Sequence, residues 1–163
     1  EKNRGFYQIM GQIDYERSGI ERLMGNYSLF EALIEFVREI KGNGKSLSQQ
    51  TLIRHKVAQL QIEFEVGRLL IYRVVRVMDE GGVPNWEAAM SKAYSTAFEQ
   101  RLASTAIEIL GLYGQLAAES KWALLHGMAL RSYLNSKGYS LQGGTSEILR
   151  NIIALRRLEL PSK

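Results

Sequence analysis

Apolar residues recur every three or four positions along most of the chain, which is the spacing that lines one face of an α-helix. The first such run covers residues 5–41 and ends at Gly42-Asn43-Gly44, a helix-stop sequence. Glycines inside the run weaken a helix by about 1 kcal/mol each. We therefore expect a long first helix with a break or bend between residues 10 and 14.

Four further helices are predicted downstream, separated by glycine and proline turns. No segment is convincing as a strand, and no repeat of fixed period occurs. The sequence thus predicts an all-α, up-and-down four-helix bundle with additional short terminal helices, as a single domain over residues 1–163. The later helices are expected from Ser46 or Ser48 to Asp79, over 86–112, over 117–136, and after Gly144. The buried face of the second is expected to include Leu52, Leu60, Phe64, Leu70, Val74 and Met78.

Composition narrows the classes of function. Hydrophobic residues make up 45% of the 163, which suits one folded domain. The absence of cysteine excludes disulfides and cysteine nucleophiles, and it fits a reducing, cytoplasmic setting. The net charge of +4 is spread among interleaved acids and bases, so we expect no nucleic-acid partner. No apolar run approaches the roughly 18 residues of a membrane span, and His55 and His126 lack a partner at metal-ligand spacing.

The most informative stretch is residues 142–154. Gly143 and Gly144 allow unusual backbone dihedral angles, and Thr145 or the serine after it can cap the helix that follows. Glu147 lies in the first turn of that helix, where the helix dipole favours an acid. Local chemistry alone indicates a glycine turn and a short amphipathic helix.

The literal residues at 142–154 and 158–161 resemble the C-terminal signature of the acyl-CoA dehydrogenases, G-G-T-S-E-I-x-R-N-I-I-A followed by L-x-L-P. In that family a carboxylate removes the α-proton of an acyl-CoA while a hydride leaves the β-carbon for flavin N5. The resemblance implies FAD as cofactor and an acyl-CoA thioester as substrate. It also implies that this chain corresponds to the C-terminal bundle, without the N-terminal helical and middle β domains of a family subunit.

The catalytic base of most family members directly precedes the G-T of the signature, where this chain has Gly143. A minority branch, the isovaleryl- and long-chain-type enzymes, carries the base on the first helix within D-x-E-R, which Asp14-Tyr15-Glu16-Arg17 resembles. The resemblance therefore implies that Glu16 is the base. Arg17 would orient the substrate or balance charge, and a surface role is the alternative. Without the family context, Glu16 and Arg17 would be an ordinary solvated charge pair.

The same resemblance places Gly143, Gly144, Thr145 and Glu147 beside FAD. Small residues let the backbone approach a cofactor, and first-turn N–H groups can donate to phosphate oxygens. A generic glycine turn has the same features.

Two further family motifs are altered. In R-x-x-F-G the Arg reaches FAD phosphates across a dimer interface, but Ile40 and Asn43 occupy the Arg and Phe positions here, which leaves Arg38 as the candidate substitute. Residues 109–114 resemble I-L-G-G-x-G, which faces FAD, often from a neighbouring subunit, although a helix cap at Gly114 explains them as well. Glu108 replaces the usual Gln before this motif, and a carboxylate near a pyrophosphate is unfavourable.

As partners, the resemblance implies a homodimer or homotetramer and an electron acceptor such as an electron-transfer flavoprotein. The isolated chain is expected to be nearly inactive, because cofactor positioning supplies much of the rate. Two alternatives remain: a flavin-dependent monooxygenase or nitroalkane oxidase of the same fold, or a purely structural oligomerisation bundle.

Overall fold

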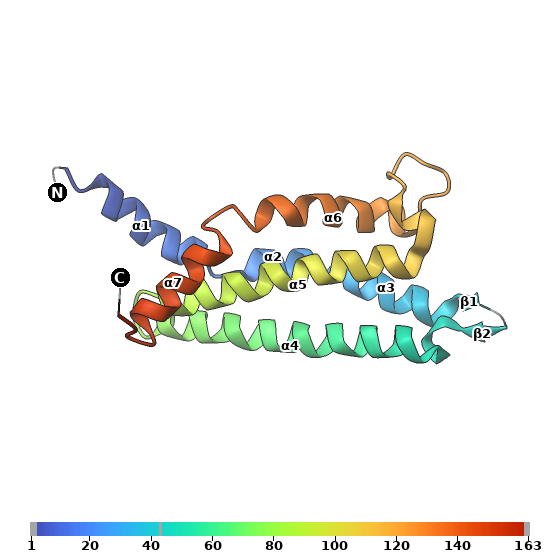
Figure 1. The fold of residues 1–163 in the computed structure, drawn as a ribbon, viewed down its shortest axis with the longest axis horizontal. Helices are drawn as coiled ribbons and strands as arrows, with labels where there is room; N and C mark the ends of the chain where they lie inside the picture. The colour runs from blue at the N-terminus through green and yellow to red at the C-terminus, as the bar shows by residue number, and fades with distance from the viewer. Residues whose placement is uncertain (1–2, 43, 162–163) are drawn as a thin grey trace.

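The structure, a computed structural model, describes residues 3–42 and 44–161 and is predominantly helical (Figure 1). The elements in chain order are α1 (Gly5–Glu16), α2 (Ile20–Gly25), α3 (Tyr27–Glu39), β1 (Lys41–Gly42), β2 (Lys45–Ser46), η1 (Leu47–Gln49), α4 (Thr51–Asp79), α5 (Trp86–Leu110), η2 (Gly111–Gln115), η3 (Leu124–Gly127), α6 (Met128–Tyr139) and α7 (Ser146–Arg156). The all-α bundle predicted from the sequence is confirmed, with one two-residue hairpin, β1–β2, as the addition.

Helix α5 is the centre of the bundle. α4 and α6 pack along its length, α2 lies against it, and α7 contacts it near its N-terminal end (Figure 1). Several helices can pack against α5 because much of its surface consists of small side chains, which let neighbouring helices approach closely. Four alanines of α5 are completely buried: Ala88, Ala89, Ala103 and Ala106.

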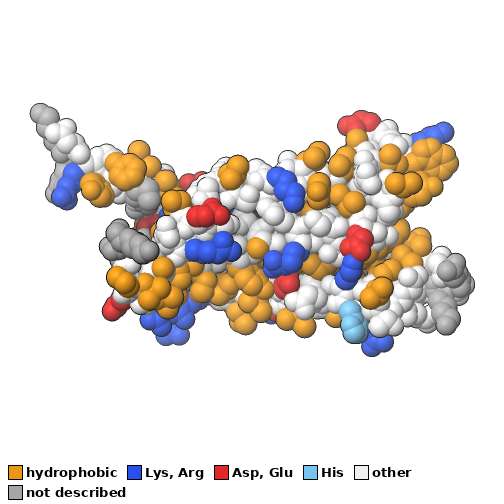
Figure 2. Space-filling model, viewed as in Figure 1, with side chains coloured by type: hydrophobic (Ala, Val, Ile, Leu, Met, Phe, Trp, Pro, Cys, Tyr) orange, Lys and Arg blue, Asp and Glu red, His pale blue; other side chains and the backbone are white. Residues whose placement is uncertain are grey.

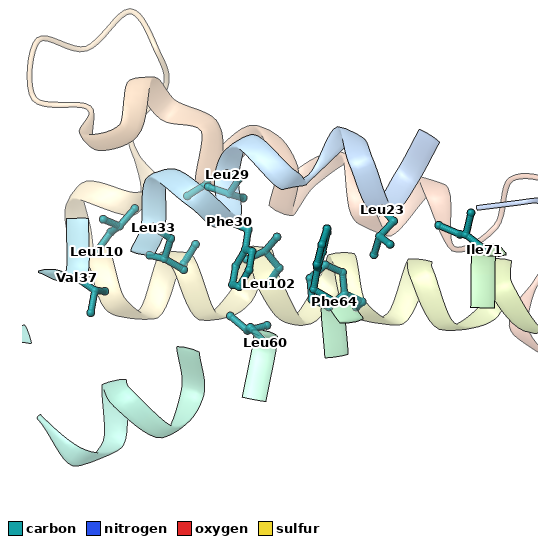
Figure 3. Packing of buried hydrophobic residues seen from close by; sticks show 13 residues of the cluster. Leu23, Leu29, Phe30, Leu33, Val37, Leu60, Phe64, Ile71, Leu102 and Leu110 are labelled. Atoms are coloured by element: carbon teal, nitrogen blue, oxygen red, sulfur yellow. The ribbon is translucent and has the colours of Figure 1, made fainter. Parts of the chain in front are cut away.

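Phe64 of α4 joins the layers of the core. Its ring lies 5.8 Å from that of Phe30 and 6.1 Å from that of Phe98, centroid to centroid, so α3, α4 and α5 share one aromatic contact. Leucines, Val37 and Ile71 extend the core along the bundle on both sides of this contact (Figure 3). Two predictions for the α4 face are wrong, because Leu52 and Met78 are 78% and 41% exposed near the ends of the helix.

The first helical run breaks later than the sequence indicated. α1 ends at Glu16 and α2 begins at Ile20, with Gly19 between them at φ +80°, so the expected break between residues 10 and 14 is wrong. Gly11 lies within regular helix, and a Cβ there would meet nothing within 4 Å. At Gly19 the chain passes so close to α5 that a Cβ would lie 3.0 Å from the Ser91 hydroxyl. Tertiary packing, rather than local propensity, therefore decided which glycine breaks the helix.

The predicted helix over residues 117–136 begins only at Met128. Leu125 and His126 have left-handed φ angles of +49° and +52°, and they precede a third left-handed residue, Gly127. A Cβ on Gly127 would lie 2.7 Å from the backbone nitrogen of Ala118, so the segment folds back on itself before α6 starts. Leu124 and Leu125 of this segment pack against the core, whereas Trp122 is 62% exposed.

The expected turn at Gly42-Asn43-Gly44 coincides with the β1–β2 hairpin, although Asn43 itself lies outside the described residues. Within residues 3–42 and 44–161, no helix has both the length and the apolar character that crossing a membrane requires.

Candidate functional site

The glycine turn connects α6 to α7 at the end of the bundle where α1 meets it (Figure 1). Both glycines use conformations that other residues rarely adopt, with φ +70° at Gly143 and +112° at Gly144. A Cβ on Gly143 would meet nothing within 4 Å, so the outer side of the turn is open. The turn therefore offers bare backbone to a neighbouring group on that side.

Arg17 ties the end of α1 to this turn. Its Nε donates a hydrogen bond of 2.6 Å to the carbonyl oxygen of Gly143, and its Nη1 lies 3.1 Å from Oδ1 of Asp14. Asp14 is fixed in turn, because Nδ2 of Asn85 donates to its Oδ2 at 2.6 Å. Arg17 is only 6% exposed, so the alternative of a surface role is wrong.

Lys92 of α5 holds the same turn from the inside, and the sequence analysis missed it. Its Nζ donates to the carbonyl oxygen of Gly144 at 2.6 Å and lies 3.4 Å from that of Ser140. The side chain is 1% exposed, and burial, helped by the charges of Arg22 and Arg17, lowers its pKa to about 8. A lysine amid the alanines of α5 is the signal that could have drawn attention to it.

Thr145 is the residue that caps α7, since its Oγ1 accepts a hydrogen bond from the backbone N–H of Ile148. Glu147 lies exposed in the first turn. A hydrogen bond from the Thr145 side chain, followed by one from its own backbone N–H, lowers the pKa of the Glu147 carboxyl. The negative charge of the Glu147 carboxylate is therefore stabilised at the start of α7, where the end of the helix dipole is positive.

Glu16 is the last residue of α1, and its side chain is exposed. It lines a cavity of about 510 Å³ together with Gly19 of the helix break, Tyr139 of α6 and Gln142 of the glycine turn. The structure therefore brings Glu16, Arg17 and residues 142–147 to one end of the bundle.

Arg38 lies elsewhere. It is exposed in the last turn of α3, at the end of the bundle away from the glycine turn (Figure 1). The motif at residues 109–114 lies at that far end too, where α5 stops at Leu110 and Gly111, at φ +61°, follows. The helix cap expected at Gly114 is therefore at Gly111, and Glu108 forms an ion pair with Lys56. Within one chain these residues and the glycine turn do not form one site.

Glu99 is a second residue that the sequence analysis missed. It is 3% exposed on α5, it lines the cavity that contains Glu16, and its Oε2 has no hydrogen-bond partner among the described residues. Burial is the main reason that the pKa of Glu99 is raised. Glu99 belongs to none of the sequence motifs, so the sequence gave no signal for it. Within the described part of the chain, no three His, Cys, Asp or Glu side chains gather as a metal site would require.

Residues 3–158 match the protein family described as the C-terminal domain of acyl-CoA dehydrogenase. The mitochondrial long-chain specific acyl-CoA dehydrogenase of Sus scrofa is 25% identical over 156 residues, which are 94% of this chain and 34% of that protein. A subunit of the caffeyl-CoA reductase–Etf complex of Acetobacterium woodii is 25% identical, over 94% of this chain and 39% of its own length. The crystal structure of an acyl-CoA dehydrogenase from Geobacillus kaustophilus superposes with a TM-score of 0.85 at 26% identity, covering 98% of this chain and 40% of that one.

The chain belongs to the acyl-CoA dehydrogenase family and has the fold of its C-terminal helical domain. It spans about a third of the length of the curated relatives that it matches.

Proposed function

We propose that this chain is the C-terminal domain of an FAD-dependent acyl-CoA dehydrogenase, in which Glu16 removes the α-proton of an acyl-CoA. The observation that carries the proposal is the position of Glu16, which lines the cavity bounded by the glycine turn while Gly143 leaves the commoner position of the base without a carboxylate. N-terminal helical and middle β domains, as in a family subunit, would complete the protein.

The glycine turn fits an FAD molecule. Gly143 has open space where a side chain would stand, so the flavin or its phosphate chain can approach the backbone. Helix α7 is capped by Thr145 and begins directly after this turn, so first-turn N–H groups that the cap leaves unpaired would be available to oxygens of the cofactor. Glu147 suits a hydroxyl donor of the cofactor better than a phosphate, because its carboxylate would repel a second anion. Bound FAD would supply the acceptor for the hydride.

Glu16 and Arg17 have different roles in the proposed reaction. Glu16 is exposed in this chain, and it needs the acyl-CoA and neighbouring protein to exclude water before its pKa rises toward the working pH. Arg17 is buried and donates from Nε to the Gly143 carbonyl and from Nη1 to Asp14, so we assign it the positioning of Glu16 against the glycine turn rather than substrate contact. Arg38, at the far end of the bundle, would serve an FAD held by a second subunit.

The decisive experiment replaces Glu16 with glutamine in the complete protein. Glu16→Gln keeps the size of the side chain but removes the base, so reduction of the flavin by acyl-CoA under anaerobic conditions should slow by about 100-fold or more. The absorbance of bound FAD should be unchanged, which separates loss of chemistry from loss of cofactor.

Glu119→Gln is the matched control, because Glu119 is exposed in the loop before η3 and should not alter the rate. Wild-type flavin reduction in Glu16→Gln would remove Glu16 from this role. Rapid reaction of the reduced flavin with oxygen, without reduction by any acyl-CoA, would favour the monooxygenase alternative. An unchanged melting temperature on addition of FAD would favour the structural bundle.

The surface supports self-association as a homodimer or homotetramer. Hydrophobic side chains reach the surface over α1, along α4 and at the segment before α6 (Figure 2). Those exposed on α4 include Leu52, Ile62, Leu69, Tyr72 and Val75. Apolar surface of this extent on one helix is typical of a contact with another subunit or domain. An electron-transfer flavoprotein is the acceptor that we propose, on the strength of the relative named as part of an Etf complex. A cytoplasmic location stays a prediction.

A further inference from the structure

Lys92 is a buried cation that contacts backbone instead of a carboxylate. Its Nζ donates to the carbonyl oxygen of Gly144 at 2.6 Å and lies 3.4 Å from that of Ser140, so one ammonium group joins the two ends of the connection between α6 and α7. The side chain is 1% exposed, and no Asp or Glu of the described residues forms an ion pair with it. Two carbonyl dipoles therefore compensate its charge.

Arg17 holds the neighbouring carbonyl group, that of Gly143, but it differs from Lys92 in two ways. It has a counter-ion, since its Nη1 lies 3.1 Å from Oδ1 of Asp14. A guanidinium also stays protonated at every pH at which a protein is folded, whereas an ammonium group can lose its proton. Of the two cations, Lys92 is therefore the one whose hydrogen bonds to the turn depend on pH.

The charged groups around Lys92 favour loss of its proton. Burial, followed by the positive charges of Arg22 on α2 and Arg17 after α1, lowers the pKa of Lys92 to about 8. Tyr139 of α6 contacts Arg22 instead, with its ring centroid 5.3 Å from the guanidinium carbon. Glu147 at the start of α7 is exposed. The neutral amine is thus accessible at moderately alkaline pH.

Loss of the proton weakens the contact without abolishing it. A neutral amine keeps two N–H groups, but hydrogen bonds from an ionised donor are roughly twice as strong. The turn contains glycines at φ +70° and +112°, which have access to many other conformations, so weaker contacts let its backbone move. Because Arg17 still holds the Gly143 carbonyl, we expect displacement of the turn rather than its unfolding.

The backbone that would move borders the proposed reaction site. Gln142 lines the same cavity as Glu16, and the outer side of Gly143 is open to a cofactor. Misplacement of reacting groups by about 1 Å can slow a reaction by about 100-fold. A charge behind the turn can therefore affect the rate without touching the substrate.

We propose that Lys92 is a positioning residue: its ammonium group holds the glycine turn in the geometry that the flavin and Glu16 require, and the reaction slows when that group loses its proton. The inference rests on the proposed function, because the flavin and the acyl-CoA are those of the proposed reaction. Lys92 itself contacts neither.

Activity and stability should change in opposite directions with pH. Because folding lowers the pKa of Lys92, loss of its proton favours the folded state, so the free energy of unfolding rises with pH above about 8. The rate of flavin reduction should fall over the same range. A lysine that served only the stability of the fold would cause no such fall.

The test follows anaerobic flavin reduction in the complete protein, with the fastest of a series of saturated acyl-CoAs from butyryl-CoA to palmitoyl-CoA. The wild-type rate constant should fall by about 10-fold as the pH rises above about 8. Lys92→Arg keeps a positive charge and should lack this alkaline fall, whatever its rate at neutral pH. Lys92→Met should lack the fall as well and should be about 10-fold slower than the wild type at neutral pH.

Lys137→Arg is the matched control, because Lys137 is exposed in the last turn of α6. It should keep the wild-type pH profile. Should Lys92→Arg not fold, Lys92→Met takes its place, since an alkaline fall that persists in a protein without this amine cannot come from Lys92.

The outcomes separate the two proposals. If an acyl-CoA reduces the flavin but the alkaline fall is absent from the wild type or persists in the Lys92 variants, the inference is overturned and the proposed function stands. If no acyl-CoA reduces the flavin, the proposed function fails, and the dissociation constant of FAD, measured by flavin fluorescence, decides about Lys92. It should rise above about pH 8 in the wild type and not in Lys92→Arg. An affinity for FAD that does not depend on Lys92, or no binding of FAD, would overturn the inference as well.

Discussion

Two buried cations hold the glycine turn by consecutive carbonyl groups. Arg17 donates to Gly143 from the end of α1, and Lys92 donates to Gly144 from α5. Hydrogen bonds from charged donors are the stronger kind, about 1.5–3 kcal/mol each. The arrangement fixes a turn whose glycines would otherwise be free to adopt many conformations, and it fixes the turn relative to Glu16.

The charge of Lys92 should make stability depend on pH. Because the folded protein lowers the pKa of this lysine from 10.5 to about 8, the folded state binds fewer protons than the unfolded state between these values. The free energy of unfolding should therefore rise as the pH increases from about 8 to 10.5, by up to about 3 kcal/mol from this residue. Denaturant unfolding of the protein and of Lys92→Met across that range measures the difference between their slopes.

Lys137→Met is the control for this series, since Lys137 is exposed in the last turn of α6. Its pH dependence should parallel that of the wild type. Identical slopes for the wild type and Lys92→Met would contradict a lowered pKa for Lys92.

At the scale of single elements, Gly19 and Gly11 form a matched pair. Gly19→Ala puts a side chain at φ +80° and within 3.0 Å of two serine hydroxyls of α5, so we expect a loss of about 1–3 kcal/mol in stability. Gly11→Ala adds a methyl group to the interior of α1, where nothing lies within 4 Å, and should stabilise the protein by about 0.5–1 kcal/mol. Thermal denaturation of both variants measures the contrast. Equal effects at the two positions would show that the break does not depend on Gly19.

At the scale of the whole molecule, the exposed apolar face of α4 is the surface on which assembly should depend. Leu69 is 63% exposed on this face, and Leu69→Lys should weaken self-association of the complete protein by about 10-fold or more, because a charge would be buried in an apolar contact. Analytical ultracentrifugation gives the dissociation constants. Leu134→Lys, on the exposed side of α6, provides the comparison, since Leu134 is 62% exposed but lies outside α4. An unchanged oligomer in Leu69→Lys would exclude this face from the interface.

The bundle could be predicted from the sequence because helical periodicity is a local property. The positions of α4, α5 and α7 follow from apolar spacing and turn residues, and Thr145 was among the expected caps of α7. The failures have a common cause. Local propensity cannot tell that Gly19 rather than Gly11 faces α5, or that residues 117–127 fold back on themselves.

Some residues of the candidate site could be predicted from the sequence, and others were found only in the structure. The family was determined by the sequence itself, because short sequence motifs are recognisable without a structure. These motifs contain the candidates Glu16, Gly143 and Gly144. Lys92 and Glu99 lie in no such motif. Only the tertiary structure revealed that α5 directs one against the glycine turn and the other into the cavity, because burial and pairing depend on which helices meet there.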